Sequence, residues 1–126
     1  MGHRSAMKEY KITKPVFKQF VKYVRYYANT WGLSDWELEV EIGKEKTDNR
    51  ATCYSGLEDK FCKITIDPMW DVEPTDKLIK SCAFHEVLEL LVAPMDVLMK
   101  ERFITLPQIN EARHTVIMRL QNLLLD

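Results

Sequence analysis

Apolar residues alternate with glutamates through residues 36–42, Trp-Glu-Leu-Glu-Val-Glu-Ile. Because successive side chains of a strand point to opposite faces, this alternation predicts a strand with one buried face. Two further segments, residues 51–55 and 61–66, flank a turn at residues 56–60 and predict two more strands, with Cys62, Ile64 and Ile66 on one face. We therefore expect a small, mostly antiparallel sheet of three strands.

A first helix is predicted over residues 14–31. Thr13 is its expected N-cap, Pro15 lies in its first turn, and Gly32 is its stop signal. Apolar residues recur along it three and four positions apart, which is the spacing of one helix face. These residues are Val16, Phe20, Val24 and Tyr27.

Two more helices are expected further along the chain. One begins at Pro74 and continues to about residue 92, before Ala93-Pro94 ends it. The last begins at Thr105, where Thr105 and Gln108 have the spacing of a capping box, and runs to the C-terminus. Together with the sheet these helices predict an α+β fold in a single domain, residues 7–126.

The helix that begins at Pro74 carries a distinctive polar pattern, His85-Glu86-x-x-Glu89, within an otherwise apolar run. At 3.6 residues per turn, His85 and Glu89 lie one turn apart on the same face, while Glu86 projects about 100° away. Their face also carries three apolar residues, Leu78, Cys82 and Val92. We therefore expect His85 and Glu89 to point toward the core, where desolvation costs several kcal/mol unless they are paired or bind a metal.

A zinc ion would explain this pattern. Catalytic zinc takes three protein ligands from imidazoles and carboxylates, and it lowers the pKa of a coordinated water to about 7. His85 and Glu89 are the expected ligands. Glu86 would accept the proton of that water as general base, which is the role of the glutamate beside the first histidine in metal-dependent peptide hydrolases.

In its order of elements and motifs the chain resembles the minimal zincin-like metallopeptidases of phage and prophage proteins, which are distantly related to the SprT-like group. The similarity covers roughly residues 14–126. It rests on Trp36-Glu37-Leu38-Glu39-Val40, Ile64-Thr65-Ile66-Asp67-Pro68, His85-Glu86-Val87-Leu88-Glu89 and Glu111-Ala112-Arg113-His114-Thr115-Val116-Ile117. The resemblance implies a zincin-like fold and zinc-dependent hydrolysis of a peptide bond, with the substrate added as a strand at a sheet edge.

The chain departs from this family at one ligand position. Members usually read His-Glu-x-x-His with a carboxylate on the late helix, whereas this chain has Glu89 in the motif and His114 on the late helix. The resemblance therefore implies that His85, Glu89 and His114 hold the metal, with the same inventory of two imidazoles and one carboxylate. Glu111, one turn before His114, is an alternative third ligand or a hydrogen-bond acceptor for an imidazole ligand.

Two alternatives to an active enzyme stay open. Glu89 can pair with His85, His114, Arg113 or Arg119 in a buried polar cluster that contains no metal. The glutamate at position 89 is also compatible with a scaffold that has lost hydrolysis and acts as an interaction or metal-binding module.

Composition and charge restrict the class of protein. The 126 residues are 46% hydrophobic, enough for the core of one domain, and the net charge of −1 gives no overall field that would attract nucleic acid or an anionic membrane. Three cysteines without a CxxC pair, Cys53, Cys62 and Cys82, favour reduced thiols over a disulfide framework or a thiolate zinc cage.

The ends and the surface of the chain give three further expectations. No apolar stretch reaches the roughly 18 residues of a membrane span and no signal peptide is recognisable, so we expect a cytoplasmic protein with no membrane partner. Residues 1–6 precede a second methionine, Met7, and resemble a remnant of expression cloning. A basic stripe on the first helix is interpreted as a solvated face, with a nucleic-acid or phosphate contact as the alternative. It consists of Lys14, Lys18, Lys22 and Arg25.

Overall fold

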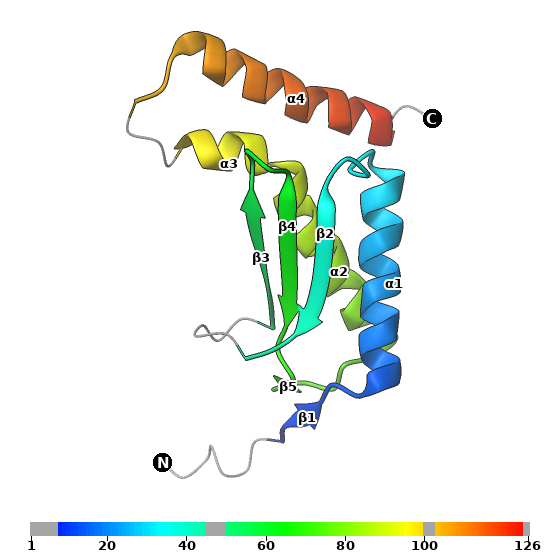
Figure 1. The fold of residues 1–126 in the computed structure, drawn as a ribbon. Coiled ribbons are helices and arrows are strands. Elements are labelled where there is room, and N and C mark those ends of the chain that lie inside the picture. The colour runs from blue at the N-terminus through cyan, green and yellow to red at the C-terminus, as the bar shows by residue number, and fades with distance from the viewer. Residues whose placement is uncertain (1–7, 45–49, 100–102, 125–126) are drawn as a thin grey trace.

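Four helices and five strands follow one another along residues 8–44, 50–99 and 103–124, the parts of the chain that the computed structural model describes. Helices and strands occur together in one arrangement, so the predicted α+β class is confirmed (Figure 1). The segment interpreted as a cloning remnant, residues 1–6, lies outside the described residues. In the described part of the chain no helix is both long and apolar enough to cross a membrane.

The three predicted strands form one sheet. They are β2 (Glu37–Ile42), β3 (Ala51–Gly56) and β4 (Phe61–Ile66), in the spatial order β2-β4-β3. β3 and β4 are antiparallel, but β2 and β4 are parallel. The expectation of a mostly antiparallel sheet is therefore wrong, because β4 rather than β3 is the central strand and β2 pairs with it in parallel. Periodicity predicts strands but not which strands become neighbours.

The first helix, α1 (Lys14–Thr30), has the predicted N-cap and stop signal. The Thr13 hydroxyl oxygen accepts a hydrogen bond from the Val16 backbone N–H at 3.4 Å. Gly32 has φ +73°, a left-handed conformation that favours glycine and turns the chain toward β2. The core-facing residues of α1 are Phe20, Val24, Tyr27 and Ala28.

The helix that carries the polar motif is α2 (Asp76–Leu91). It begins two residues later than predicted, because the Thr75 hydroxyl oxygen caps it by accepting from the Leu78 N–H at 3.2 Å. α2 ends just before the predicted stop at Ala93-Pro94. The same two residues also begin a short further helix, α3 (Ala93–Met99), which the sequence pattern did not reveal. Proline is well tolerated in a first helical turn, so it ends one helix and starts the next.

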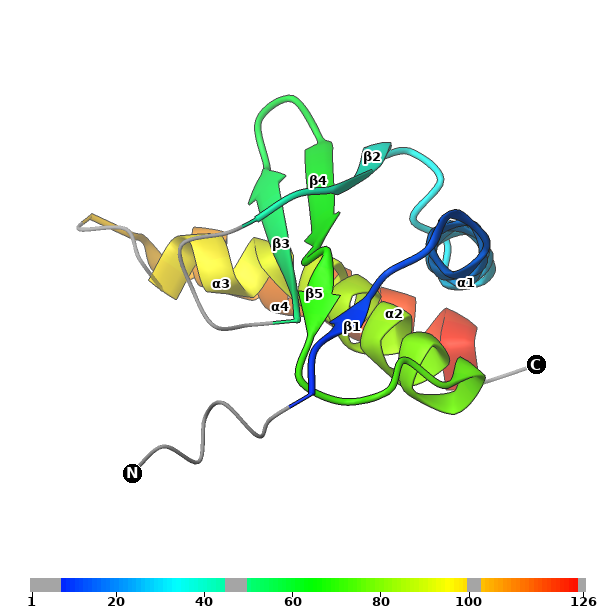
Figure 2. The ribbon, with the colours of Figure 1, turned by 90° about the horizontal axis from the view of Figure 1, so that it is seen from below.

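The core lies between the sheet and the two helices α1 and α2, which occupy the same side of the sheet (Figure 2). β4 contributes the expected face of Cys62, Ile64 and Ile66, each with no exposed area. Two short strands, β1 (Tyr10–Lys11) and β5 (Met69–Trp70), pair antiparallel below the sheet and bring Trp70 into the core. The sequence did not predict either of these two-residue strands.

The C-terminal helix, α4 (Leu106–Leu124), begins with the predicted capping box. The Thr105 N–H donates to Gln108 Oε1 at 2.8 Å, and the Gln108 N–H donates to Thr105 Oγ1 at 3.3 Å. α4 packs mainly against α3, across one end of the sheet (Figure 1).

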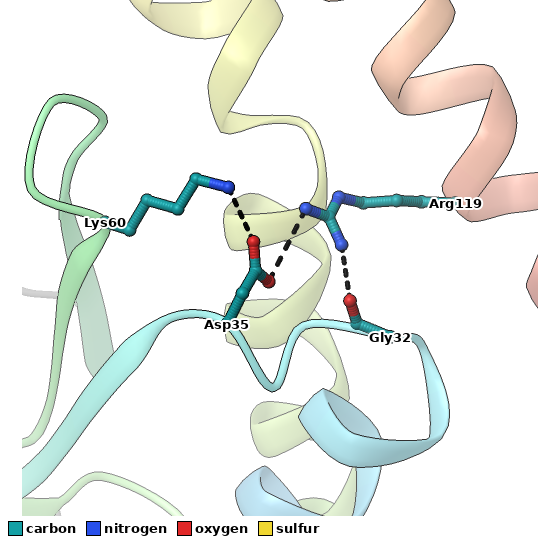
Figure 3. Close-up of polar contacts among 4 residues, drawn as sticks. All are labelled: Gly32, Asp35, Lys60 and Arg119. Carbon is teal, nitrogen blue, oxygen red and sulfur yellow. Dashed lines mark hydrogen bonds and ion pairs between the residues drawn. The ribbon is translucent and has the colours of Figure 1, made fainter.

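One arginine ties α4 to the turn between α1 and β2 (Figure 3). Arg119 Nη1 donates to the Gly32 carbonyl oxygen at 2.6 Å, and Nη2 lies 3.7 Å from Asp35 Oδ1. The other carboxylate oxygen of Asp35 accepts from Lys60 at 2.6 Å. Together Lys60 and Arg119 contribute to lowering the pKa of Asp35, although burial opposes them. This cluster links α4 to the turn between α1 and β2 and to Lys60 in the turn between β3 and β4.

Candidate metal centre

α2 turns a different face to the core from the one predicted. The side chains of His85 and Glu89 keep 71% and 53% of their exposure, so the expectation that they point toward the core is wrong. α2 carries apolar residues on more than one side. Its periodicity is therefore compatible with burial of either of two neighbouring faces. The face that packs inward is Ile79, Ala83, Glu86, Val87, Leu90 and Leu91.

The three polar residues of the motif nevertheless come together at one point. His85 Nε2 lies 3.8 Å from Glu89 Oε2, as expected for side chains one turn apart. One potential ligand atom from each of His85, Glu86 and Glu89 lies within 4.8 Å of the other two. A single helix therefore supplies one imidazole and two carboxylates to a common centre.

Glu86 is the buried member of this group. Only 3% of the residue is exposed, and its Oε1 has no hydrogen-bond partner among the described residues. Burial, with the neighbouring Glu89 carboxylate as a smaller cause, raises the pKa of Glu86 to about 8. A buried carboxyl oxygen without a donor is costly, and a cation at the centre of the group would satisfy it.

The group lies at the wall of a cavity of about 670 Å³ between α2 and the strands β3 and β5. Residues 51–53 of β3 form one side, and β3 is an edge strand of the sheet. Arg50 lies at the rim, where its Nε donates to Asp71 at 3.3 Å and its guanidinium lies 5.7 Å from the Trp70 ring centre. The cavity therefore extends from the polar group to residues of an edge strand.

α4 does not bring its two predicted site residues to this group. His114 and Glu111 are both exposed, and neither lines the cavity beside α2. Glu111 instead lines a separate cavity of about 350 Å³, together with Trp36 and Lys60. Among the residues that the structure describes, the group that could hold a metal is His85, Glu86 and Glu89, without a contribution from α4.

The metal-free cluster considered from the sequence is formed only in part. The His85–Glu89 contact is present, but the pair is exposed rather than buried. Arg119 contacts Gly32 and Asp35, and Arg113 is exposed on α4. Solvent screening makes an exposed pair of this kind only weakly stabilising. A contribution to protein stability therefore does not by itself explain the motif.

Two thiols line the cavity, Cys82, which the helical spacing placed on the face of His85 and Glu89, and Cys53, which the sequence pattern did not connect with the motif. Burial, with Glu86 as a smaller cause, raises the pKa of the Cys82 thiol to about 12. The pKa of Cys53 is also raised, first by its hydrogen bond with Cys62 and then by burial. Cys82 lies one helical turn before Glu86, so the two side chains lie on the same side of α2.

The basic stripe on α1 is exposed along its whole length, at Lys14, Lys18, Lys22 and Arg25. Arg25 Nη2 donates to the Leu38 carbonyl oxygen at 3.4 Å. The interpretation as a solvated helix face is compatible with this placement and stays a prediction.

The residues at the cavity fit a divalent cation. An imidazole and carboxylates are ligands that zinc accepts, and the unsatisfied Oε1 of Glu86 supplies an acceptor where a cation would lie. Comparisons with protein-family models, with curated proteins and with solved structures give no significant match to this chain.

Proposed function

We propose that this chain is a zincin-like, zinc-dependent peptide hydrolase of the phage and prophage type, with His85 and Glu89 as metal ligands and Glu86 as general base. One observation carries the proposal: the three motif side chains gather within 4.8 Å beside a cavity of about 670 Å³. Titratable groups with shifted pKa values in a cavity are typical of functional sites.

Glu86 has the properties that a general base requires. Its pKa of about 8 lies near neutral pH, where a carboxylate both accepts a proton readily and returns it. Burial among apolar residues of α2 holds its side chain in place beside His85 and Glu89. When bound, zinc would supply the Lewis acid that activates water and polarises the scissile carbonyl.

The edge of β3 is where a peptide substrate would bind. Residues 51–53 line the cavity from a strand that pairs with β4 on one side. An extended peptide added along this edge would run past the motif of α2, and recognition would depend mainly on backbone hydrogen bonds.

Metal content tests the first part of the proposal. Protein purified without chelator is expected to contain about one zinc per chain, and His85→Ala is expected to remove it, because metal binding requires each ligand. Glu111→Gln, at the other cavity, is the matched control and should retain the metal. A folded protein that takes up no zinc at neutral pH would refute the proposal.

A second function is favoured by the geometry of α4. Because His114 does not join the group, Glu86 completes a three-donor site only by acting as a ligand, which leaves no base. The chain would then be a metal-binding or interaction module on a zincin-like scaffold. Glu86→Gln separates the two functions when the cleavage of an unfolded protein is measured with added zinc.

The two outcomes of that comparison differ in metal content as well as in rate. If Glu86 is the base, Glu86→Gln retains zinc but loses cleavage by about 100-fold or more. If Glu86 is a ligand, the substitution reduces zinc binding, and wild-type protein loaded with zinc does not cleave.

A further inference from the structure

The β3–β4 hairpin brings two thiols into contact. The sulfur atoms of Cys53 and Cys62 lie 3.5 Å apart and share a hydrogen bond. In the register of the hairpin Cys53 lies opposite Ile64 and Ser55 lies opposite Cys62. The two cysteines are therefore diagonal neighbours whose side chains share one face of the sheet.

The two sulfurs differ in their access to solvent. Cys62 has no exposed area, whereas Cys53 is half-buried and lines the cavity beside α2. A small oxidant that enters the cavity therefore reaches the Cys53 sulfur, and the buried Cys62 sulfur is its neighbour at 3.5 Å. Cys82 also lines this cavity, but the structure gives its sulfur no thiol neighbour among the cysteines, all three of which are described.

We propose that Cys53 and Cys62 form a reversible disulfide site that hydrogen peroxide oxidises through the cavity. Because the pKa of Cys53 is raised, its thiol must first lose a proton, which makes this step slow. The Cys53 thiolate sulfur then attacks one peroxide oxygen, the O–O bond breaks, the released hydroxide takes up the proton, and a sulfenic acid and one water result. The Cys62 sulfur then attacks the sulfenic sulfur, the S–O bond breaks, and a second water leaves with the Cys62 proton. Two thiols lose two electrons in total, and one peroxide is reduced to two waters.

The geometry explains both why this pair reacts and why the reaction is reversible. A disulfide bond is about 2.05 Å long, so the sulfurs approach by roughly 1.5 Å, a movement within reach of side-chain rotation and a small shift of the edge strand β3. A diagonal pair is more widely spaced than a directly opposite pair, so we expect thiols to reduce the bond readily. Because Cys53 belongs to the cavity wall, oxidation alters the wall that faces Glu86.

Peptide mapping tests the proposal without any assay of metal or hydrolysis. Trypsin cleaves after Arg50, Lys60 and Lys63, so Cys53 and Cys62 fall on separate peptides, residues 51–60 and 61–63. The reduced full chain is treated with hydrogen peroxide, blocked with N-ethylmaleimide and digested without reductant. The expected product is these two peptides joined, two hydrogens lighter than their sum, and dithiothreitol should separate them.

Two cysteine variants, a mixture of labelled and unlabelled chains and a denatured sample serve as controls. Cys82→Ala should form the same linked peptide in the same yield, and Cys62→Ala should instead leave Cys53 as a sulfenic acid that dimedone traps. A mixture of ¹⁵N-labelled and unlabelled chains distinguishes links within a chain from links between chains. Oxidation in guanidinium chloride shows the pairings that the three thiols form without the fold.

The proposal is overturned if the native wild-type chain gives no linked peptide, links Cys82 as often as it links Cys53 to Cys62, or forms only mixed-label links. These results come from the wild-type chain, so they hold even if Cys62→Ala fails to fold.

Discussion

His85 Nε2 and Glu89 Oε2 lie 3.8 Å apart on the exposed side of α2, while Glu86 between them in sequence is buried. This relationship reverses the simplest interpretation of the motif, in which the two ligands are buried and the base is accessible. It places the desolvation cost on Glu86 alone.

The stability of the metal-free protein should fall as the pH rises from about 4.5 to 8. In the unfolded chain Glu86 ionises near 4.5, whereas in the folded chain its pKa is about 8. Between these values the unfolded state loses the proton first, so ionisation favours unfolding, by at most about 5 kcal/mol at pH 8 and above. Below pH 4.5 the carboxyl is neutral in both states and this cost is absent.

Chemical denaturation with chelator at a series of pH values measures this effect. Glu86→Gln should remove most of the loss of stability between pH 5 and 8, whereas Glu58→Gln, at an exposed site, should leave the profile unchanged. Parallel profiles for wild type and Glu86→Gln would show that Glu86 does not carry this cost.

If Glu86 is a metal ligand, zinc affinity should increase with pH more steeply in wild type than in Glu86→Gln. A carboxylate binds a metal only when ionised, and the Glu86 pKa of about 8 means that binding at pH 7 releases a proton. If Glu86 contacts the metal, its ionisation contributes up to about tenfold in affinity per pH unit below 8. Titration calorimetry in buffers of different ionisation enthalpy counts the released protons, and equal counts for both proteins would argue against contact between Glu86 and the metal.

Arg119→Ala should loosen α4 and lower the stability of the chain by about 1–3 kcal/mol. It removes a charged hydrogen bond to the Gly32 carbonyl and an ion pair with Asp35 from a side chain that is only 15% exposed. Arg113→Ala on the same helix is the matched control, since Arg113 is exposed. Hydrogen exchange of the α4 amides should accelerate in Arg119→Ala alone. Similar exchange in the two variants would mean that Arg119 does not anchor the helix.

Local patterns in the sequence predicted most elements of the fold. The alternation of residues 36–42, the Thr13 cap, the Gly32 stop and the Thr105–Gln108 box each depend on interactions between residues close in sequence, and the structure contains all of them. The insertion of β4 between β2 and β3 depends on contacts between distant segments. No periodicity within a strand carries that information.

The candidate site was predictable only in its composition. The spacing of His85, Glu86 and Glu89 indicated a metal group, and one helix brings the three together as spacing requires. The sequence did not reveal which face of α2 is buried, because several of its sides are apolar. Nor did it reveal that Arg119 of α4 contacts Gly32, far from the motif, or that His114 on the same helix is exposed.

Competition titration of zinc against a coloured chelator, for wild type, His85→Ala and His114→Ala, tests the central claim most directly. A ligand set confined to α2 predicts that His85→Ala loses at least about 100-fold in affinity, since contacts outside the ligands are themselves worth 10- to 100-fold, while His114→Ala binds as wild type does. An equal loss in the two variants, or unchanged affinity in His85→Ala, would contradict the claim.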